Sequence, residues 1–371
     1  MTSNLSSLCT YAKGKVSVDT LPKQNYVSTE NMLPNKEGIV DAGGLPSVQY
    51  VQQYIKGDIL VSNIRPYFKK IWMADKDGGC SNDVLVFRAA HGCDSTFLYY
   101  VLSNDAFFNY ASATSKGTKM PRGDKTAIMQ YEVPCFDHET QLRIGKLLRS
   151  IDARITINKK INDNLEQQAT TLFKALFVDI APFDGTMPPN WTISTLGDVT
   201  EMGAGGDKPK EFSPVKTPLC PYPIYSNGIN DYGLYGYTNE PKIKVESVTV
   251  SARGTIGYVC LRHIPYVPIV RLVTLVPDTK MLSAKYLYLY LRLLHITGTG
   301  TTQQQLTVPD FRKTEIVIPD KNIMGSFTET VTPLFERIWA NEDENTKLAE
   351  VRDALLPKLM SGEIDVSSVQ L

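Results

Sequence analysis

Residues 143–177 read RIGKLLRSIDARITINKKINDNLEQQATTLFKALF, and this stretch decides the fold. Its apolar and asparagine positions alternate in steps of three and four, which is the heptad spacing of a coiled-coil seam. The seam positions are Leu148, Ile151, Ile155, Asn158, Asn162, Leu165, Ala169, Leu172 and Leu176. At about 1.5 Å per residue such a helix is roughly 50 Å long. An isolated helix would leave this stripe uncovered, so the sequence predicts a helical partner.

A second copy of the pattern near the C-terminus supplies that partner. The shift of 183 residues that carries Arg154 to Arg337 also carries Ile155 to Ile338 without a gap. Five further seam positions fall on identical residues, from Asn158, Asn162, Leu165, Leu172 and Leu176 to Asn341, Asn345, Leu348, Leu355 and Leu359. Chance matching of leucines does not explain two asparagines in register, so we infer an internal repeat.

The four seam asparagines have a physical use. Asparagine in an apolar seam costs stability and pairs well only with another polar group at the same level. We therefore predict that Asn158, Asn162, Asn341 and Asn345 fix how two antiparallel helices of one chain slide against each other. The alternatives are solvated positions at the edge of the seam, and helices that pair with other copies of the chain.

Each long helix follows a globular region, and the two regions share one order of patterns. Val61-Ser62 matches Val250-Ser251, and Phe97-Leu98-Tyr99 matches Tyr286-Leu287-Tyr288, at one shift of 189 residues. Each region contains short strands, one apolar helix capped at residues 94–96 or at Ser283, and then a polar loop. We predict an α+β fold: two similar mixed α/β domains separated by two long antiparallel coiled-coil helices, with a pseudo-twofold internal repeat.

The same patterns set the expected boundaries. We expect a first domain over 1–137, a long helix over 138–180, a second domain over 181–320, and a C-terminal helix and tail over 321–371. With 371 residues and 42% hydrophobic content the chain can form real cores. The formal net charge is zero, so only the local distribution of charge can indicate a nucleic-acid partner.

Composition also excludes several classes of protein. The six cysteines are scattered without a Cys-x-x-Cys pair, which is typical of free thiols in a reducing compartment. No signal pattern and no run of about 18 apolar residues is present. We therefore expect a cytoplasmic protein with no membrane partner.

The search for catalytic motifs is negative. The sequence has no P-loop, no G-x-G-x-x-G after a strand and no G-x-S-x-G, and its four histidines are isolated. Residues 202–206 (MGAGG) are glycine-rich and are interpreted as a flexible loop. We expect no catalytic residue, no metal site and no cofactor bound by this chain.

Two matched loops carry the best evidence for nucleic-acid binding. The loop at 115–125 carries Lys116, Lys119, Arg122 and Lys125 against one acid, and its glycines allow close approach to a phosphate. Its counterpart at 298–305 is uncharged but rich in threonine and glutamine, and glutamine can bond bidentately to adenine. The alternative for both is an ordinary exposed polar loop.

Further candidates lie in the loops that follow the matched strands. Arginine is the commonest specific contact to guanine, and lysine neutralises phosphates. The full predicted set of DNA-contacting residues is Ser62, Arg65, Lys69, Lys70, Lys116, Thr118, Lys119, Arg122, Lys125, Ser226, Asn227, Ser251, Arg253, Thr301, Thr302, Gln303, Gln304 and Gln305.

These segments together resemble the specificity subunit of type I restriction-modification enzymes. YPIYSNGIN (222–230) with VTVSARGTIGYV (248–259), and GDILVSNIRPYFKK (57–70), resemble parts of that family's target recognition domains. IDARITINKKINDNLEQQATTLFKALF (151–177) is similar to its central conserved region, and DALLPKLMSGEIDV (353–366) to its C-terminal end. WTISTLGDV (191–199) resembles the start of a second recognition domain. The first region lacks this tryptophan-containing start, so we expect its outer edge to be shortened.

The resemblance implies a division of labour. Each domain would read one half of a bipartite double-stranded DNA target, and the paired helices would set the unread gap. Two modification subunits would bind S-adenosylmethionine and methylate adenine, and restriction subunits would use ATP and Mg²⁺ for translocation and cleavage. The specificity subunit itself would not be an enzyme.

Two other functions fit parts of the pattern. The first is a structural scaffold, in which a coiled coil carries two protein-binding heads. The second is a self-sufficient nuclease, which the absence of an acid or histidine cluster disfavours. The contrast between a basic loop and a glutamine-rich loop favours DNA over the scaffold.

Overall fold

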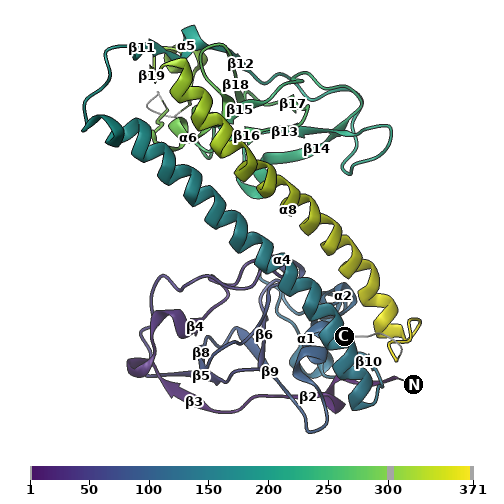
Figure 1. The fold of residues 1–371 in the computed structure, drawn as a ribbon. Coiled ribbons are helices and arrows are strands. Elements are labelled where there is room, and N and C mark those ends of the chain that lie inside the picture. Colours follow the sequence, from purple (N-terminus) through teal and green to yellow (C-terminus); the bar gives the residue numbers. More distant parts are fainter. Residues whose placement is uncertain (1, 299–304, 368–371) are drawn as a thin grey trace. The chain divides into compact units, whose positions relative to one another are not determined.

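The structure is a computed structural model that describes residues 2–298 and 305–367. It contains two compact units, shown with their elements in Figure 1. Unit 1 is formed by residues 1–158 and 343–371, and unit 2 by residues 159–342. The division falls inside both long helices, α4 (His138–Phe173) and α8 (Lys321–Ser361), so each unit contains part of each helix. The boundaries expected from the sequence instead set the helices apart from the globular domains.

Unit 1 is built on two four-stranded sheets. The first has the order β2-β9-β6-β7 and is antiparallel throughout, and the second has the order β3-β5-β8-β4 with one parallel pair, β4 and β8. Their strands are β2 (Cys9–Tyr11), β3 (Lys15–Ser17), β4 (Tyr26–Val27), β5 (Tyr50–Tyr54), β6 (Ile59–Ser62), β7 (Ile71–Met73), β8 (Gly78–Cys80) and β9 (Val84–Ala89). The short strands β1 (Thr2–Asn4) and β10 (Glu132–Pro134) form a separate antiparallel pair.

The helices of unit 1 cover the first sheet. They are α1 (Ser95–Ser103), α2 (Asp105–Ala113) and α3 (Lys125–Ile128). The sequence predicted one helix here, but Asn104 is extended and its side chain caps α2 through the Ala106 N–H, so the helix is broken in two. Gly145 of α4 lies against the start of α1, where a Cβ would meet the Phe97 backbone nitrogen at 3.2 Å.

Unit 2 repeats this arrangement. Its main sheet has the order β12-β18-β15-β16, a smaller sheet has the order β14-β13-β17, and β11 pairs with β19. The strands are β11 (Thr192–Thr195), β12 (Thr200–Ala204), β13 (Tyr222–Tyr225), β14 (Leu234–Thr238), β15 (Ser247–Val250), β16 (Val259–Arg262), β17 (Val267–Pro268), β18 (Val273–Pro277) and β19 (Glu315–Ile318). The helices are α5 (Leu196–Val199), α6 (Ala284–Leu293) and α7 (Val308–Phe311).

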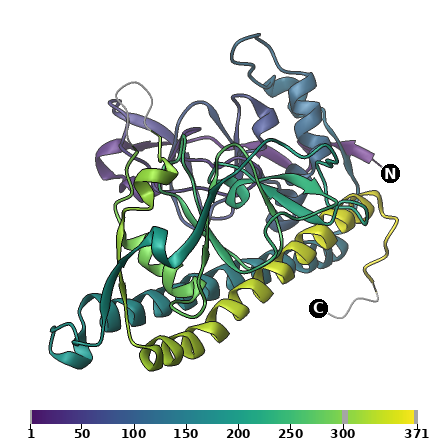
Figure 2. The ribbon, with the colours of Figure 1, turned by 90° about the horizontal axis from the view of Figure 1, so that it is seen from above.

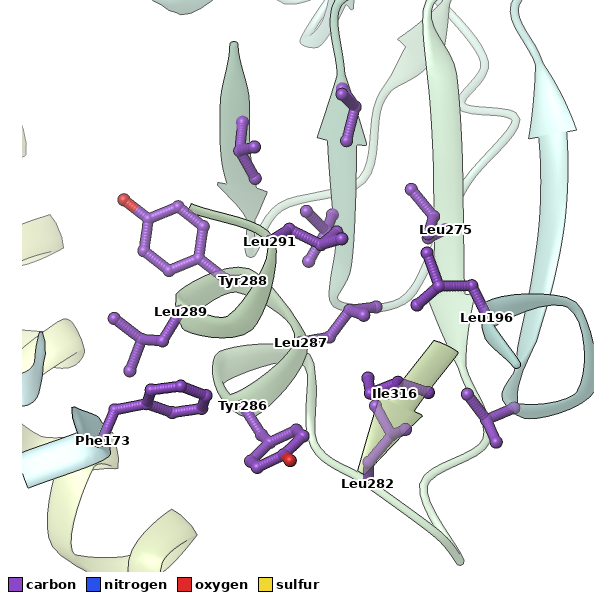
Figure 3. Close-up of a cluster of buried hydrophobic side chains, with 14 of the residues drawn as sticks. Phe173, Leu196, Leu275, Leu282, Tyr286, Leu287, Tyr288, Leu289, Leu291 and Ile316 are labelled. Carbon is purple, nitrogen blue, oxygen red and sulfur yellow. The ribbon is translucent and has the colours of Figure 1, made fainter. Parts of the chain in front are cut away.

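The core of unit 2 lies between its main sheet and α6. Figure 3 shows Leu287 on the sheet side of α6, facing Leu275 and Leu196. On the other side of α6, Phe173 of α4 packs against Tyr286, with ring centroids 5.2 Å apart. The long helix is therefore part of the hydrophobic core of the unit and not a separate rod.

The same antiparallel pair of strands occurs in both units, β1 with β10 and β11 with β19. The expected shortening of the first region stays a prediction. One expectation needs correction. Residues 202–206 are not a flexible loop: the Gly205 N–H donates to the Leu272 carbonyl (2.8 Å), and the Val270 N–H to the Gly206 carbonyl (2.9 Å). A Cβ at Gly205 would lie 2.7 Å from the Ile269 backbone, so this close approach requires glycine.

The segments of α4 and α8 pair antiparallel in each unit, and Figure 2 shows the helices side by side from above. In unit 1, Arg154 pairs with Glu344 and Asp152 with Arg352. In unit 2, Asn162 contacts Asn341 and Phe173 contacts Phe327. All nine predicted seam positions are buried or half-buried; eight lie in α4, and Leu176 lies in the π-helical turn that follows it (Lys174–Val178).

The seam asparagines bond to one another. In unit 1 the Asn158 Nδ2 donates to Asn345 Oδ1 (3.0 Å) and to Glu344 (2.9 Å). In unit 2 the Asn341 Nδ2 donates to Asn162 Oδ1 (2.7 Å), and the Asn162 Nδ2 to the Ile338 carbonyl (3.1 Å). Their role in fixing the register stays a prediction.

Removal of one seam asparagine should destabilise the protein, because its partner then stays buried without a hydrogen bond. Asn341 is buried. Among the described residues, its side-chain amide makes one hydrogen bond, which the Nδ2 atom donates to Asn162 Oδ1. We expect Asn162→Ala to lower the free energy of unfolding by about 1–3 kcal/mol, because a buried donor loses its acceptor. The double variant Asn162→Ala/Asn341→Leu should recover much of this loss. Urea unfolding measures both.

Asn164→Ala is the matched control for this experiment. Asn164 lies two residues further along the same helix and is exposed, so its loss should change the unfolding midpoint little. Equal losses in Asn162→Ala and Asn164→Ala would contradict the prediction.

Candidate nucleic-acid interface

The structure brings together two segments of unit 1 that the sequence predicted separately. The loop that follows β6 meets the loop that precedes α3. The Gly123 N–H donates to the Asn63 carbonyl (3.1 Å), and the Arg65 N–H donates to the Pro121 carbonyl (2.8 Å). A Cβ at Gly123 would lie 2.9 Å from Asn63 Oδ1, so glycine permits this approach. We call this pair of loops junction 1 (residues 62–70 and 115–125).

Unit 2 contains the equivalent pair of loops. The Leu306 N–H donates to the Ala252 carbonyl (3.1 Å), and Arg253 donates to the Gln305 side-chain oxygen (2.9 Å). Ala252 is the repeat counterpart of Asn63, and Leu306 that of Gly123, at the two shifts found in the sequence. We call this pair junction 2 (residues 251–258 and 305–307). Thr301, Thr302, Gln303 and Gln304 lie outside the described residues.

Junction 1 is strongly cationic although the chain is neutral overall. Eight basic side chains lie in or beside it, against the three carboxylates of Asp83, Asp105 and Asp124. The basic residues are Lys36, Arg65, Lys69, Lys70, Lys116, Lys119, Arg122 and Lys125. This excess of positive charge suits a polyanion.

Several of these cations are already engaged within the protein. Lys36 and Lys69 both pair with Asp105, at 2.7 and 2.8 Å. Burial alone would raise the pKa of Asp105, but the two ammonium groups bring it below its ordinary value. Lys70 donates to the Thr29 carbonyl (2.6 Å), and burial lowers its pKa. Lys69 and Lys70 therefore hold the loop in place first and are less available to phosphates than the sequence suggested.

The loop at 115–125 contains both paired and unpaired cations. Lys116 pairs with Asp124 (2.5 Å), and Arg122 with Asp83 (3.1 Å). The Asp124 side chain also caps α3, and these bonds hold its pKa below the ordinary value. Lys119 and Lys125 are exposed and have no ion pair within the described part of the chain. Thr118 is exposed beside them. Lys119 and Lys125 are thus the freest cations of junction 1.

The two matched serines are corrected from contact residues to structural ones. Ser62 is 4% exposed and Ser251 is 1% exposed. The Ser62 hydroxyl donates to the Ile64 carbonyl (3.1 Å). The side chains of Ser62 and Ser251 lie too deep for direct contact with DNA. Ser62 is the last residue of β6, and Ser251 directly follows β15.

Asn227 is likewise engaged by the protein. Its Nδ2 donates to the Val270 carbonyl (2.7 Å), and its Oδ1 accepts from the Ala252 N–H (2.7 Å). Asn227 therefore ties the loop that carries Arg253 to the end of β17. Ser226 is half-buried, and its hydroxyl points to the Asn227 carbonyl (3.4 Å). Both residues position junction 2 and do not present a free side chain to a ligand.

Sequence reasoning missed an exposed aromatic pair in junction 1. Tyr67 and Phe68 form the short 3₁₀ turn Pro66–Phe68, and their rings contact each other at 4.8 Å between centroids. The Arg-Pro-Tyr-Phe-Lys-Lys run was the available signal, because two aromatics among cations fit a surface that binds nucleic acid.

The described residues contain no cluster of three or more histidine, cysteine, aspartate or glutamate side chains that could hold a metal ion. None of the helices within that part of the chain is long and apolar enough to cross a membrane. The six cysteines are free thiols.

Comparison with known proteins defines the class. The chain belongs to the family of type I restriction-modification DNA specificity domains, whose model matches residues 1–167 and 188–350. The fold agrees: a specificity subunit structure from M. genitalium superposes with a TM-score of 0.60 at 18% identity, over 97% of this chain and 96% of that one.

Two similar proteins are named as specificity subunits. The MjaIX specificity subunit of Methanocaldococcus jannaschii is 28% identical over 75% of this chain and 71% of its own length. The HindI specificity subunit of Haemophilus influenzae is 26% identical over 92% of this chain and 95% of its own. The chain is thus a non-catalytic DNA specificity subunit, and the scaffold interpretation is not favoured.

Loss of Asn227 should loosen junction 2. Asn227→Ala removes two backbone bonds, so we expect the free energy of unfolding to fall by about 1–3 kcal/mol. Asn230→Ala is the matched control, because Asn230 is exposed a few residues further along the same loop. Urea unfolding of both variants checks this, and no difference between them would refute the positioning role of Asn227.

Proposed function

We propose that each unit reads one half of a bipartite double-stranded DNA target, unit 1 through junction 1 and unit 2 through junction 2. One observation carries this proposal. The same backbone hydrogen bond joins the two loops of each junction, while the side chains that the loops present differ. Junction 1 is cationic, and junction 2 presents Arg253 and Gln305. A common framework with unlike surfaces suits two readers of unlike sequences.

The charge of junction 1 assigns its side chains to different tasks. Lys119 and Lys125 contact phosphates, since they are exposed and free of carboxylates. Arg122, which is 53% exposed beside Asp83, is the candidate for a base contact. In junction 2, Arg253 and Gln305 act together, since their hydrogen bond aligns both side chains.

The partners follow from the same proposal. The outer faces of α4 and α8 dock two modification subunits, which bind S-adenosylmethionine and methylate adenine in the target. Restriction subunits join the complex and use ATP and Mg²⁺. This chain binds none of these cofactors and works in the cytoplasm. The two long helices set the length of the unread gap.

Exchange of the loop at 115–125 tests the assignment of halves. The loop is replaced by that of another specificity subunit, the chain is expressed with its modification subunit, and adenine methylation is mapped genome-wide. We expect one half of the methylated motif to change and the other half and the gap to stay. A change in both halves, or in neither with methylation intact, would contradict the proposal.

Removal of the free cations tests the phosphate contacts. Lys119→Ala/Lys125→Ala should weaken DNA binding by the complex about tenfold and lower the salt slope by about 1–2, because up to two counterions fewer are released. The motif should not change, because phosphate contacts carry no sequence information. Fluorescence anisotropy at several salt concentrations measures the slope.

Lys15→Ala/Lys23→Ala serves as the control for this pair. Both lysines are exposed in unit 1 but lie in β3 and near β4, outside junction 1. Equal losses of affinity and slope in the two double variants would show that junction 1 has no special role.

A further inference from the structure

The aromatic pair of junction 1 is exposed to solvent. Tyr67 is 52% exposed and Phe68 is 39% exposed, and their ring planes meet at 56°. Two adjacent exposed aromatics contribute little to the core of unit 1. Their position is the tip of the loop between β6 and β7, in the same loop as Arg65.

The backbone holds this pair in a strained conformation. Arg65 (φ 49°) and Lys69 (φ 52°), on either side of the turn, are both left-handed. Such conformations cost energy for residues other than glycine and persist only where surrounding contacts fix them. Here the Asn35 N–H donates to the Phe68 carbonyl and the Lys36 N–H to the Lys69 carbonyl, both at 2.9 Å. Asn35 and Lys36 are also left-handed. The tip is therefore rigid.

Side-chain contacts join the tip to α2. Lys36 and Lys69 converge on Asp105 in the first turn of α2. On the other side, the Arg65 N–H bonds to the Pro121 carbonyl in the loop at 115–125. The aromatic tip is thus continuous with the cationic surface of junction 1.

The internal repeat shows that the fold does not require this tip. At the shift of 189 residues, Arg65 corresponds to Gly254, Tyr67 to Ile256 and Phe68 to Gly257. Gly254 has the same left-handed conformation (φ 68°) without the strain that arginine carries. Unit 2 therefore makes this loop with glycine at the left-handed position and without an aromatic at either position of the pair; its Tyr258 stands at the position of Lys69. The aromatic pair is a feature of unit 1 alone.

We propose that Tyr67, supported by Phe68, stacks on a base at an opened step of the half-target that unit 1 reads. This rests on the proposed function of junction 1. An aromatic ring can stack on any base or wedge between two, and Lys119 and Lys125 of the same junction are exposed and can contact the neighbouring phosphates. The positive charge around the tip favours DNA over an apolar protein partner.

The test uses the complex of this chain with its modification subunit and duplexes with 2-aminopurine at successive positions of the mapped half-target. Stacking on an opened step unstacks one base, so its fluorescence should rise at one position. Tyr67→Ala should abolish the rise and weaken binding about 5- to 100-fold. Tyr67→Phe should retain both. Tyr50→Ala, which removes a tyrosine of the same unit that is 53% exposed, should change neither.

The outcomes distinguish the stacking role of Tyr67 from the proposed DNA reading by junction 1. A complex that binds its target normally but shows no fluorescence change at any position overturns the stacking role alone. If the Tyr67→Ala chain no longer binds the modification subunit, and any intact Tyr67→Ala complex gives the same 2-aminopurine fluorescence as the wild type, the tip contacts a protein. That result also overturns the stacking role. A wild-type complex without preference for its target overturns both proposals.

Discussion

One side-chain hydrogen bond occurs twice in the seam between the long helices, and we predict that it sets their alignment. In unit 1 the Asn158 amide donates to Asn345, and in unit 2 the Asn341 amide donates to Asn162. At the shift of 183 residues Asn158 corresponds to Asn341 and Asn345 to Asn162, so both bonds join the same two positions of the repeat. Asn158 and Asn341 are buried, and their own Oδ1 atoms have no partner among the described residues. A shift of one helix by a turn would leave one asparagine pair level and separate the other, so we predict that the seam favours the observed alignment.

This constraint separates the framework of each unit from the surface that it presents. The seam fixes the segments of α4 and α8, and their inner residues, such as Phe173, complete the core. On that core one buried serine ends β6 and another directly follows β15, and the same backbone bond closes each junction. The loop side chains are then free to differ, as Lys119 and Gln305 do. Target preference can therefore change without a change of fold.

Much of this framework could be predicted from the sequence, because periodicity and repetition are local properties. The steps of three and four identified the seam. The constant shifts identified the repeat, and the shared order of patterns identified the matched loops. The caps at Asp94 and Ser283 were also readable. The break at Asn104 was missed, because an asparagine inside an apolar pattern can either cap a new helix or continue the old one.

The candidate site was less readable, because its side chains are positioned by contacts that are distant in sequence. Ser62 and Asn227 looked like contact residues, and only the fold shows that their polar atoms bond to the protein. The exposure of Tyr67 was not predicted, because its loop is held by left-handed residues of a second loop, Asn35 and Lys36. A sequence pattern reveals which residues are polar but not which polar groups are already satisfied.

We propose that the paired helices set the gap between two independently read halves of the target. The most direct measurement is to insert one heptad into α4 and a matched heptad into α8, in register with the seam, and to map adenine methylation with the modification subunit present. Seven helical residues add about 10 Å, the rise of about three base pairs. We expect a gap longer by up to about three base pairs, with both halves of the motif unchanged. An unchanged gap, or altered halves, would contradict this proposal.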